Sequence, residues 1–223
     1  MWRSSNETMN PQALQLPVAF NAGAVFFFAL TGALAARRLG YDIIGVFVLA
    51  FATGLGGGLL RDSLLRGSGP VVALTDPLFM LVVLLATLCG LFRLSTRIEN
   101  FNRVLAVLDA IGLGAFAVVG TDKSLKLELH WLAAVFVGVV NAVGGGLLRD
   151  LLIRTEPLLL KPGQFYALAA LTGAIAYAAM TLHWQLPALH AAVYATIVTV
   201  IFRMLAIIFN WKTRAVEAPL ESP

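Results

Sequence analysis

Long apolar segments separated by short charged connections constrain the fold of this chain more than any other feature. A membrane-spanning helix needs about 20 apolar residues. Seven segments of the 223-residue sequence are long enough, at approximately residues 18–36, 43–65, 76–92, 104–121, 131–153, 164–182 and 188–209. The sequence therefore predicts an all-α polytopic membrane protein with seven transmembrane helices, forming a single membrane domain over residues 1–223.

The composition also indicates lipid as the solvent of this protein. Hydrophobic residues make up 59% of the chain and charged residues 13%, and the mean hydropathy is +0.85. Soluble domains average about 45–50% apolar and about 25% charged residues. The net charge of +4 does not indicate nucleic-acid binding, because Lys and Arg lie in short clusters between the apolar segments, as membrane orientation and anionic headgroups favour. Membrane lipid, and not nucleic acid, is the expected partner.

The distribution of Lys and Arg predicts the orientation of the chain. Alternate connections place ten basic residues on the side of the C-terminus and five on the other side. Arg203 is left out of this count because it lies within the seventh segment, from which we expect it to snorkel to the headgroups. Cytoplasmic loops carry the excess of basic residues. We therefore expect a multi-pass protein of the cell (inner or plasma) membrane, with the N-terminus outside and the C-terminus in the cytoplasm.

One seven-residue sequence occurs twice, inside the second and fifth apolar segments. Residues 56–62 and residues 144–150 both read Gly-Gly-Gly-Leu-Leu-Arg-Asp, an offset of 88 that also aligns Phe28 with Phe116. Each copy of the repeat contains three helices, an odd number of crossings, so the second copy starts from the opposite side of the membrane. The expected organisation is two inverted repeats followed by an additional helix, at residues 18–92, 104–182 and 188–209.

The glycine triplets fall near the middle of their segments, where they weaken a helix. Each glycine costs a helix about 1 kcal/mol relative to alanine, so the backbone is expected to kink or unwind there. Broken helices at matching positions of inverted halves are typical of a transport pathway, although small residues also allow close helix packing. We favour the pathway, and its glycines are Gly56, Gly57, Gly58, Gly144, Gly145 and Gly146.

Polar and charged side chains accompany both triplets. Ionisable residues inside a membrane usually face a cavity or a partner, and two readings remain open here. The residues line a pore, or they form structural pairs, for which Asp62 with Arg66 and Asp150 with Arg154 have i,i+4 spacing. The candidate pathway residues beside the glycines are Arg61, Asp62, Arg149, Asp150, Thr53, Asn141 and Asp109.

No constellation of catalytic or metal-binding residues is evident in the sequence. Cys89 is the only cysteine, and His130, His183 and His190 lack metal-ligand spacing. The triplets lie in apolar segments without the strand or the lysine of a phosphate-binding loop. We expect neither an enzyme, a bound metal nor a cofactor.

The segments around the repeat resemble the prokaryotic relatives of the trimeric intracellular cation (TRIC) channels, a group also labelled as glycine-transporter-like membrane proteins. The resemblance lies in residues 23–38, 45–62 and 109–150 and covers nearly the whole chain except its two tails. It implies seven helices, a homotrimer, and a potassium-permeable pore in each protomer. It also implies that the pore lies at kinked second and fifth helices, which here contain residues 56–58 and 144–146.

The leading hypothesis is a monovalent cation channel for an ion such as potassium. Carbonyl groups freed at the glycine breaks, together with the nearby polar side chains, would replace part of the hydration shell of the ion. Arg61 and Arg149 oppose a cation unless Asp62 and Asp150 neutralise them or the arginines swing as gates. Two alternatives remain, a small amino-acid (glycine) transporter and a non-transporting membrane scaffold in which the glycines only pack helices.

Overall fold

The computed structural model describes residues 16–65, 75–92, 98–161 and 165–211. These residues form seven helices, α1 (Val18–Arg38), α2 (Ile43–Leu64), α4 (Pro77–Phe92), α5 (Ile98–Lys126), α6 (Trp131–Leu152), α7 (Tyr166–Leu182) and α8 (Ala188–Ile208). Five of them are long and apolar enough to cross a membrane, whereas α4 and α7 are shorter apolar helices. At 1.5 Å per residue α4 and α7 are about 24–26 Å long, close to the ~30 Å of a hydrocarbon core. The expected all-α fold is confirmed.

Helix α5 is the one element whose bounds differ clearly from the expected segment. It begins at Ile98 and ends at Lys126, whereas the apolar segment covers residues 104–121. The expectation was wrong because it assigned the charged residues after Thr121 to a connection. In the structure Asp122 is buried and accepts hydrogen bonds from Tyr177 and Lys126, each at 2.6 Å. Charged residues that have such partners can continue a helix.

The turn between α1 and α2 shows why a short connection is sufficient. Gly40 has a φ of +76°, a left-handed conformation that ends α1 without steric cost. The Asp42 carboxylate then accepts a hydrogen bond of 2.8 Å from the Gly45 amide and caps α2. The two helices are thereby joined as an antiparallel pair.

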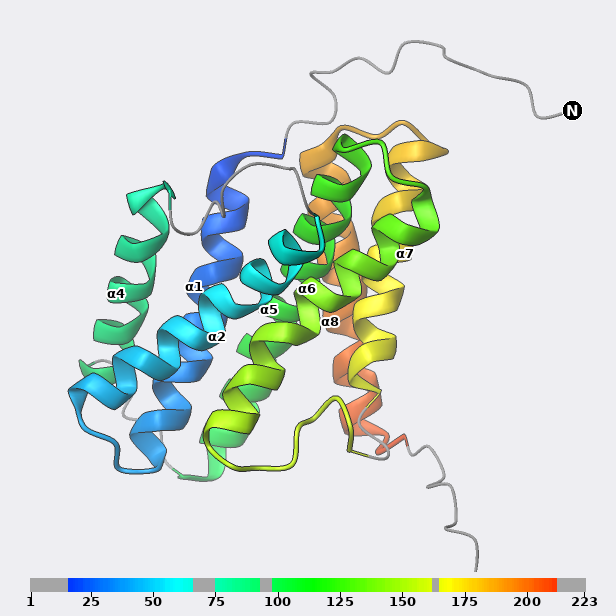
Figure 1. Ribbon diagram of the computed structural model, residues 1–223. Helices are drawn as coiled ribbons and strands as arrows, with labels where there is room; N and C mark the ends of the chain where they lie inside the picture. Colours follow the sequence, from blue (N-terminus) through cyan, green and yellow to red (C-terminus); the bar gives the residue numbers. More distant parts are fainter. Residues whose placement is uncertain (1–15, 66–74, 93–97, 162–164, 212–223) are drawn as a thin grey trace, which may run out of the picture.

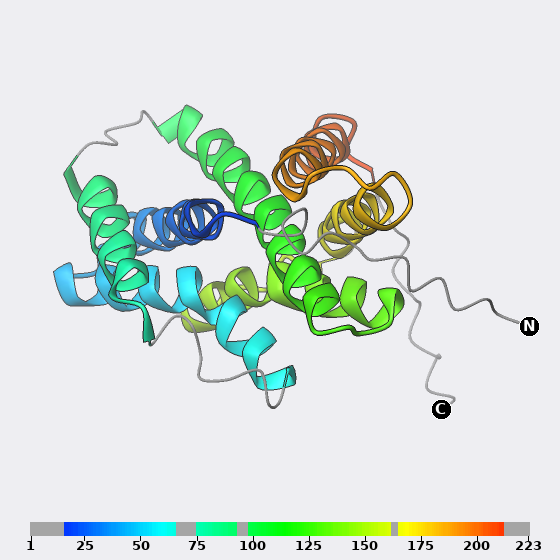
Figure 2. The ribbon, with the colours of Figure 1, turned by 90° about the horizontal axis from the view of Figure 1, so that it is seen from above.

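The two repeats lie side by side with opposite directions (Figure 1). We call the end of the bundle where α1 begins and α5 ends the upper end, and the end where α1 ends and α5 begins the lower end. Helix α4 packs on α1, α7 packs on α5 and α6, and α2 of the first repeat contacts α6 of the second. Helix α8, outside the repeat, packs against α5 and α7 on the side of the molecule away from α4 (Figure 2). The fold is therefore two inverted three-helix repeats plus a seventh helix.

The outer surface of the bundle is apolar. Leu81, Leu85 and Leu88 are 48–53% exposed along α4, and Ile197 and Ile201 are 48% and 53% exposed along α8. Water-soluble proteins rarely expose apolar surface of this extent. Together with the apolar helices, this surface identifies a multi-pass membrane protein.

Candidate functional site

The two glycine triplets lie where α2 crosses α6. Both helices remain α-helical through their triplets, over Ile43–Leu64 and Trp131–Leu152, so the expected unwinding is wrong. Helix α2 does change direction along its length, as the view from above shows (Figure 2). No carbonyl group is therefore freed within these two helices. The triplets have to be explained by what surrounds them.

The second glycine of each triplet allows close backbone contact. A Cβ atom added to Gly57 would collide with the carbonyl oxygen of Asn141, and one added to Gly145 would collide with the carbonyl oxygen of Thr53. Thr53 and Asn141 are themselves equivalent in the repeat. The expected packing role of small residues therefore accounts for Gly57 and Gly145.

The first and third glycines have other neighbours. Cβ atoms added to Gly56 and Gly144 would meet the side chains of the partner helix, Leu148 and Leu60. A Cβ on Gly58 would have only the Arg61 guanidinium nearby, at 3.8 Å, whereas one on Gly146 would lie 2.6 Å from the Tyr166 hydroxyl oxygen. The third glycine therefore faces a charged side chain in the first repeat and a tyrosine hydroxyl in the second.

Thr53 and Asn141 lie in contacts between helices. Thr53 Oγ1 donates a hydrogen bond of 2.6 Å to Leu49 O and lies beside Gly32. Asn141 Nδ2 donates one of 2.6 Å to Phe116 O and lies beside Gly120, the repeat equivalent of Gly32. Asn141 Oδ1 is buried and has no hydrogen-bond partner among the residues that the structure describes. Of the two side chains, Asn141 thus presents a free oxygen.

The first Arg-Asp pair forms a cluster with α5 toward the upper end. Arg61 Nε lies 2.7 Å from Asp62 Oδ1, and Lys123 Nζ lies 2.8 Å from the same oxygen. Arg61 and Asp62 are 3% and 9% exposed. One carboxylate is therefore shared by two cations, and Asp62 neutralises Arg61, which was the condition stated above for a cation to pass.

The second Arg-Asp pair forms the corresponding cluster toward the lower end. Arg149 Nε lies 2.9 Å from Asp150 Oδ1, and Arg149 Nη1 lies 2.8 Å from Asp109 Oδ1. Thr31 Oγ1 also accepts a hydrogen bond of 3.1 Å from Arg149 Nη1. Here one cation is shared by two carboxylates, the reverse of the first cluster.

Two expectations about charged residues are corrected. Asp150 pairs with Arg149 rather than with Arg154, because α6 ends at Leu152 and Arg154 leaves the helix with a φ of +55°. Arg66, the expected partner of Asp62, lies outside the described residues. Arg203 does not snorkel to the surface; it is 4% exposed, and its guanidinium lies 5.2 Å from the centroid of the Tyr166 ring.

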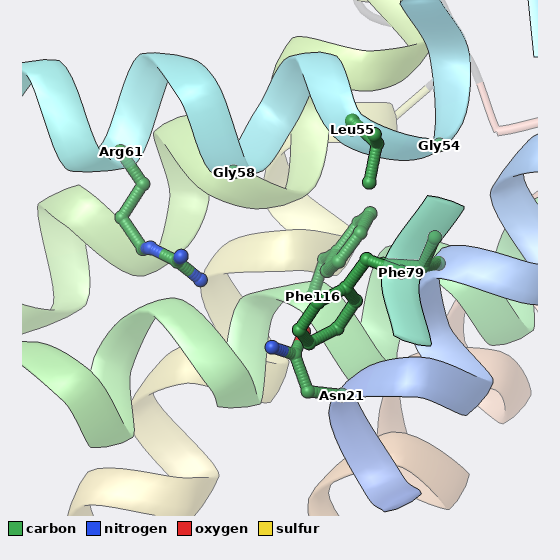
Figure 3. Close-up of a pocket in the computed structure, with 8 residues that line it drawn as sticks. Asn21, Gly54, Leu55, Gly58, Arg61, Phe79 and Phe116 are labelled. Atoms are coloured by element: carbon green, nitrogen blue, oxygen red, sulfur yellow. The ribbon is translucent and has the colours of Figure 1, made fainter. Parts of the chain in front are cut away.

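Two adjoining cavities lead inward from the upper end to Arg61. The outer one, of about 200 Å³, is lined by charged groups that include Asp76, Asp122 and Lys123. The inner one, of about 20 Å³, lies beside Gly54 and Gly58 and shares Asn21, Arg61 and Phe79 with the outer one. Figure 3 shows Arg61 reaching from α2 at one side of the inner cavity, with Leu55, Phe79 and Phe116 gathered at the other.

An aromatic pair lies at the inner cavity. Phe28 and Phe116, equivalent residues of the two repeats, lie with ring centroids 5.1 Å apart and are 0% and 1% exposed. Phe116 also lines the inner cavity. The centre of the bundle thus contains one buried ring from each repeat, stacked beside the inner cavity.

A third cavity, of about 250 Å³, opens at the lower end. Its polar lining consists of Asn102, Asp109, Arg149 and Arg203, and Leu158 and Ile207 are among its apolar lining residues. The Leu158 amide donates a hydrogen bond of 3.0 Å to Asp150 Oδ2, which fixes the loop after α6 beside this cavity. The lower cavity therefore ends on Arg149, as the upper ones end on its repeat equivalent, Arg61.

Sequence reasoning missed the partners that other helices supply. Thr31, Lys123, Tyr166 and Arg203 all contact or approach the two clusters, and they come from α1, α5, α7 and α8. Only Arg203 carried a signal, since it is an ionisable residue inside an apolar segment. Thr31 and Tyr166 are ordinary residues of their segments, and Lys123 was assigned to a connection.

The family model described as "Glycine transporter" matches residues 18–94 and again residues 106–182. Among curated proteins, the inner membrane protein YadS of Escherichia coli (strain K12) is 36% identical over 187 residues, which cover 83% of this chain and 88% of YadS. The membrane protein YvgT of Bacillus subtilis (strain 168) is 36% identical over 191 residues, 84% of this chain and 90% of YvgT.

The fold is also similar to that of solved structures. The TRIC trimeric intracellular cation channel orthologue from Rhodobacter sphaeroides superimposes with a TM-score of 0.78 at 33% identity, covering 86% of this chain and 97% of the orthologue. A second TRIC cation channel structure gives a TM-score of 0.74 at 33% identity, covering 92% of this chain and all of that chain (100%).

Proposed function

Because this chain belongs to the prokaryotic TRIC-type membrane protein family, whose family model is described as a glycine transporter, we propose that it is a cation channel. The proposed ion is monovalent, such as potassium, and no other ligand or cofactor takes part. Each protomer has its own pathway, and the working form is a homotrimer. Ion permeation, rather than catalysis, is the proposed activity.

The observation that carries the proposal is the convergence of cavities on the two repeat-equivalent arginines. Cavities from the upper end reach Arg61, and the cavity from the lower end reaches Arg149. Asp62, Asp109 and Asp150 pair with these arginines and remove the charge that would oppose a cation. Buried ionisable groups of this kind are typical of ion pathways.

In this proposal the described state is a closed one, and the open state differs from it at two places. The rings of Phe28 and Phe116 have to separate, because they lie together at the inner cavity. Arg61 and Arg149 also have to turn partly away, so that their carboxylate partners face the passing ion. The α2–α6 crossing at Gly57 and Gly145 supplies a rigid frame for both movements. In this proposal Gly58 lines the inner cavity, Gly146 leaves space for the Tyr166 hydroxyl, and the other expected pathway glycines pack the two helices together.

Recordings from the purified protein in planar lipid bilayers under a KCl gradient test this proposal. A cation channel gives currents that reverse near the equilibrium potential of potassium. The matched variants Asp62→Asn and Asp109→Asn remove one carboxylate from each cluster, and both should shift the reversal potential toward that of chloride. Anion-selective currents, or no current under any applied voltage, would overturn the proposal.

A glycine transporter is the second candidate, and the lower cavity is the observation that favours it. Its lining offers both a guanidinium, from Arg203, and a carboxylate, from Asp109, as a zwitterion requires. Proteoliposomes that contain the protein should then take up glycine, and the initial rate of uptake should saturate as the glycine concentration is raised. Saturable uptake without ohmic current would replace the channel proposal with this one.

A further inference from the structure

The charged side chains that the second repeat places at the lower cavity do not sum to zero. Arg149 carries one positive charge, and its two partners Asp109 and Asp150 carry one negative charge each. At the position equivalent to Asp109 the first repeat has the neutral Asn21. The second cluster by itself thus holds one uncompensated negative charge in a buried position, which is costly in a membrane.

Helix α8, which has no counterpart in the repeat, supplies the missing positive charge. Arg203 lines the same cavity as Asp109, is 4% exposed, and has its guanidinium 5.2 Å from the centroid of the Tyr166 ring. Asp109, which has no acidic equivalent in the first repeat, is therefore neutralised by Arg203, which lies outside the repeat. With Arg203 in place the cluster is neutral.

A buried hydroxyl at the same place has no partner. Tyr166 is 2% exposed, and its oxygen makes no hydrogen bond to any residue that the structure describes. The guanidinium of Arg203 lies over the ring of the same side chain, 5.2 Å from its centroid. Gly146 leaves the space that this hydroxyl occupies, because a Cβ there would lie 2.6 Å from it. A buried hydroxyl without a protein partner points to a ligand that it would bind.

We infer that Asp109 and the Tyr166 hydroxyl form a binding site for a monovalent cation, and that in the described state Arg203, which lies over the Tyr166 ring, neutralises this site as a tethered cation. The inference rests on the proposed channel function and makes Arg203 the residue that limits cation entry from the lower end. Oxygen ligands suit a hard cation such as potassium, and a single uncompensated charge suits a monovalent ion better than a divalent one. A cation that enters from the lower end then has to displace Arg203 before it can bind.

Binding is tested first, without any current. Arg203→Gln removes the tethered charge but keeps a hydrogen-bond donor, and Arg203→Met serves as a second variant if the first does not fold. In either variant KCl should raise the apparent melting temperature above that in choline chloride of equal concentration, because a ligand stabilises the state that binds it. The wild type and the double variant Asp109→Asn/Arg203→Gln should show no such difference. Equal potassium-dependent stabilisation in the double variant would overturn the site.

Conduction provides the second test and separates the site from the channel proposal. Arg203→Gln should raise the unitary potassium conductance by roughly threefold or more, since conduction depends on the ion reaching each site in turn. The matched control Arg154→Met removes one exposed positive charge from the same end and should leave the conductance unchanged. If the wild type conducts cations and Arg203→Gln changes neither conductance nor melting, this inference fails and the channel stands. If potassium stabilises Arg203→Gln through Asp109 but no variant conducts, the channel fails and the site stands.

Discussion

At the residue scale, the glycine triplets show how one motif serves two purposes. Gly57 and Gly145 lie against backbone carbonyl groups of the facing helix, whereas Gly58 lies beside a cavity with only Arg61 near it. Helix propensity counts the cost of a glycine to its own helix, but it says nothing about the neighbour that a missing side chain admits. For this reason the sequence located the triplets correctly, but it did not predict that both helices continue through them.

Alanine variants separate the two kinds of glycine. Gly57→Ala forces α2 and α6 apart and should destabilise the protein by about 1–3 kcal/mol, the usual cost of overpacking a core. Gly58→Ala, one residue further along the same helix, has room for the added methyl group and should leave the melting temperature nearly unchanged.

The apparent melting temperatures of both variants in one detergent provide the measurement. Gly145→Ala is the matched change in the second repeat and should behave as Gly57→Ala does. Equal stability of Gly57→Ala and Gly58→Ala would contradict the assignment of separate roles.

Much of the charged site could also be predicted at this scale. Arg61, Asp62, Arg149, Asp150 and Asp109 were all expected beside the triplets, and the structure brings them together as two clusters. Their partners could not be predicted, because Lys123 and Arg203 come from distant parts of the sequence and only the fold brings them near. Local i,i+4 spacing favoured Asp150 with Arg154, but the helix ends too early for that pair.

At the element scale, apolar length predicted the helices well because lipid imposes a nearly fixed span. Six of the seven described helices begin and end within two residues of the expected segments. Helix α5 was the exception, since Asp122 and Lys123 are stabilised by Tyr177 and Asp62 of other helices. A sequence segment read alone does not reveal such partners.

The contact between α1 and α5 leads to a prediction about opening. Phe28→Ala or Phe116→Ala removes one ring of the central pair and should raise the open probability in bilayer recordings, because in the proposed pathway these rings have to separate for an ion to pass beyond the inner cavity. Phe26→Ala is the control, as Phe26 lies on the same helix but pairs with its neighbour Phe27. An unchanged open probability in both ring variants, with normal folding, would show that the path does not pass between them.

At the scale of the whole molecule, the inverted repeat determines the arrangement of the site. Two copies with opposite directions place equivalent arginines toward opposite ends of one bundle, so each end has a cavity that leads to an Arg-Asp pair. The odd number of helices in each copy predicted this inversion. Helix α8 breaks the symmetry, and its Arg203 makes the lower half chemically different from the upper half.

The orientation of the bundle in the membrane remains a prediction from the Lys and Arg distribution. In a Cys89→Ala background, Glu128→Cys marks the upper end and Leu160→Cys, at a position 68% exposed, marks the lower end. We expect an impermeant maleimide to label Glu128→Cys on intact spheroplasts and Leu160→Cys only after permeabilisation. The reverse pattern would invert the orientation and assign the Arg203 cavity to the outside.

Chemical block at Asn21, which lines both upper cavities, tests the proposed ion pathway through the protomer. Asn21→Cys in the Cys89→Ala background is recorded in bilayers while a cationic methanethiosulfonate reagent is added to the chamber that faces the upper end. Leu132→Cys, at a position 57% exposed on the outer surface near the same end, is the matched control. We expect a cation current that falls sharply and irreversibly in Asn21→Cys and persists in Leu132→Cys. A cation current that the reagent leaves unchanged in Asn21→Cys would contradict a pathway through the protomer.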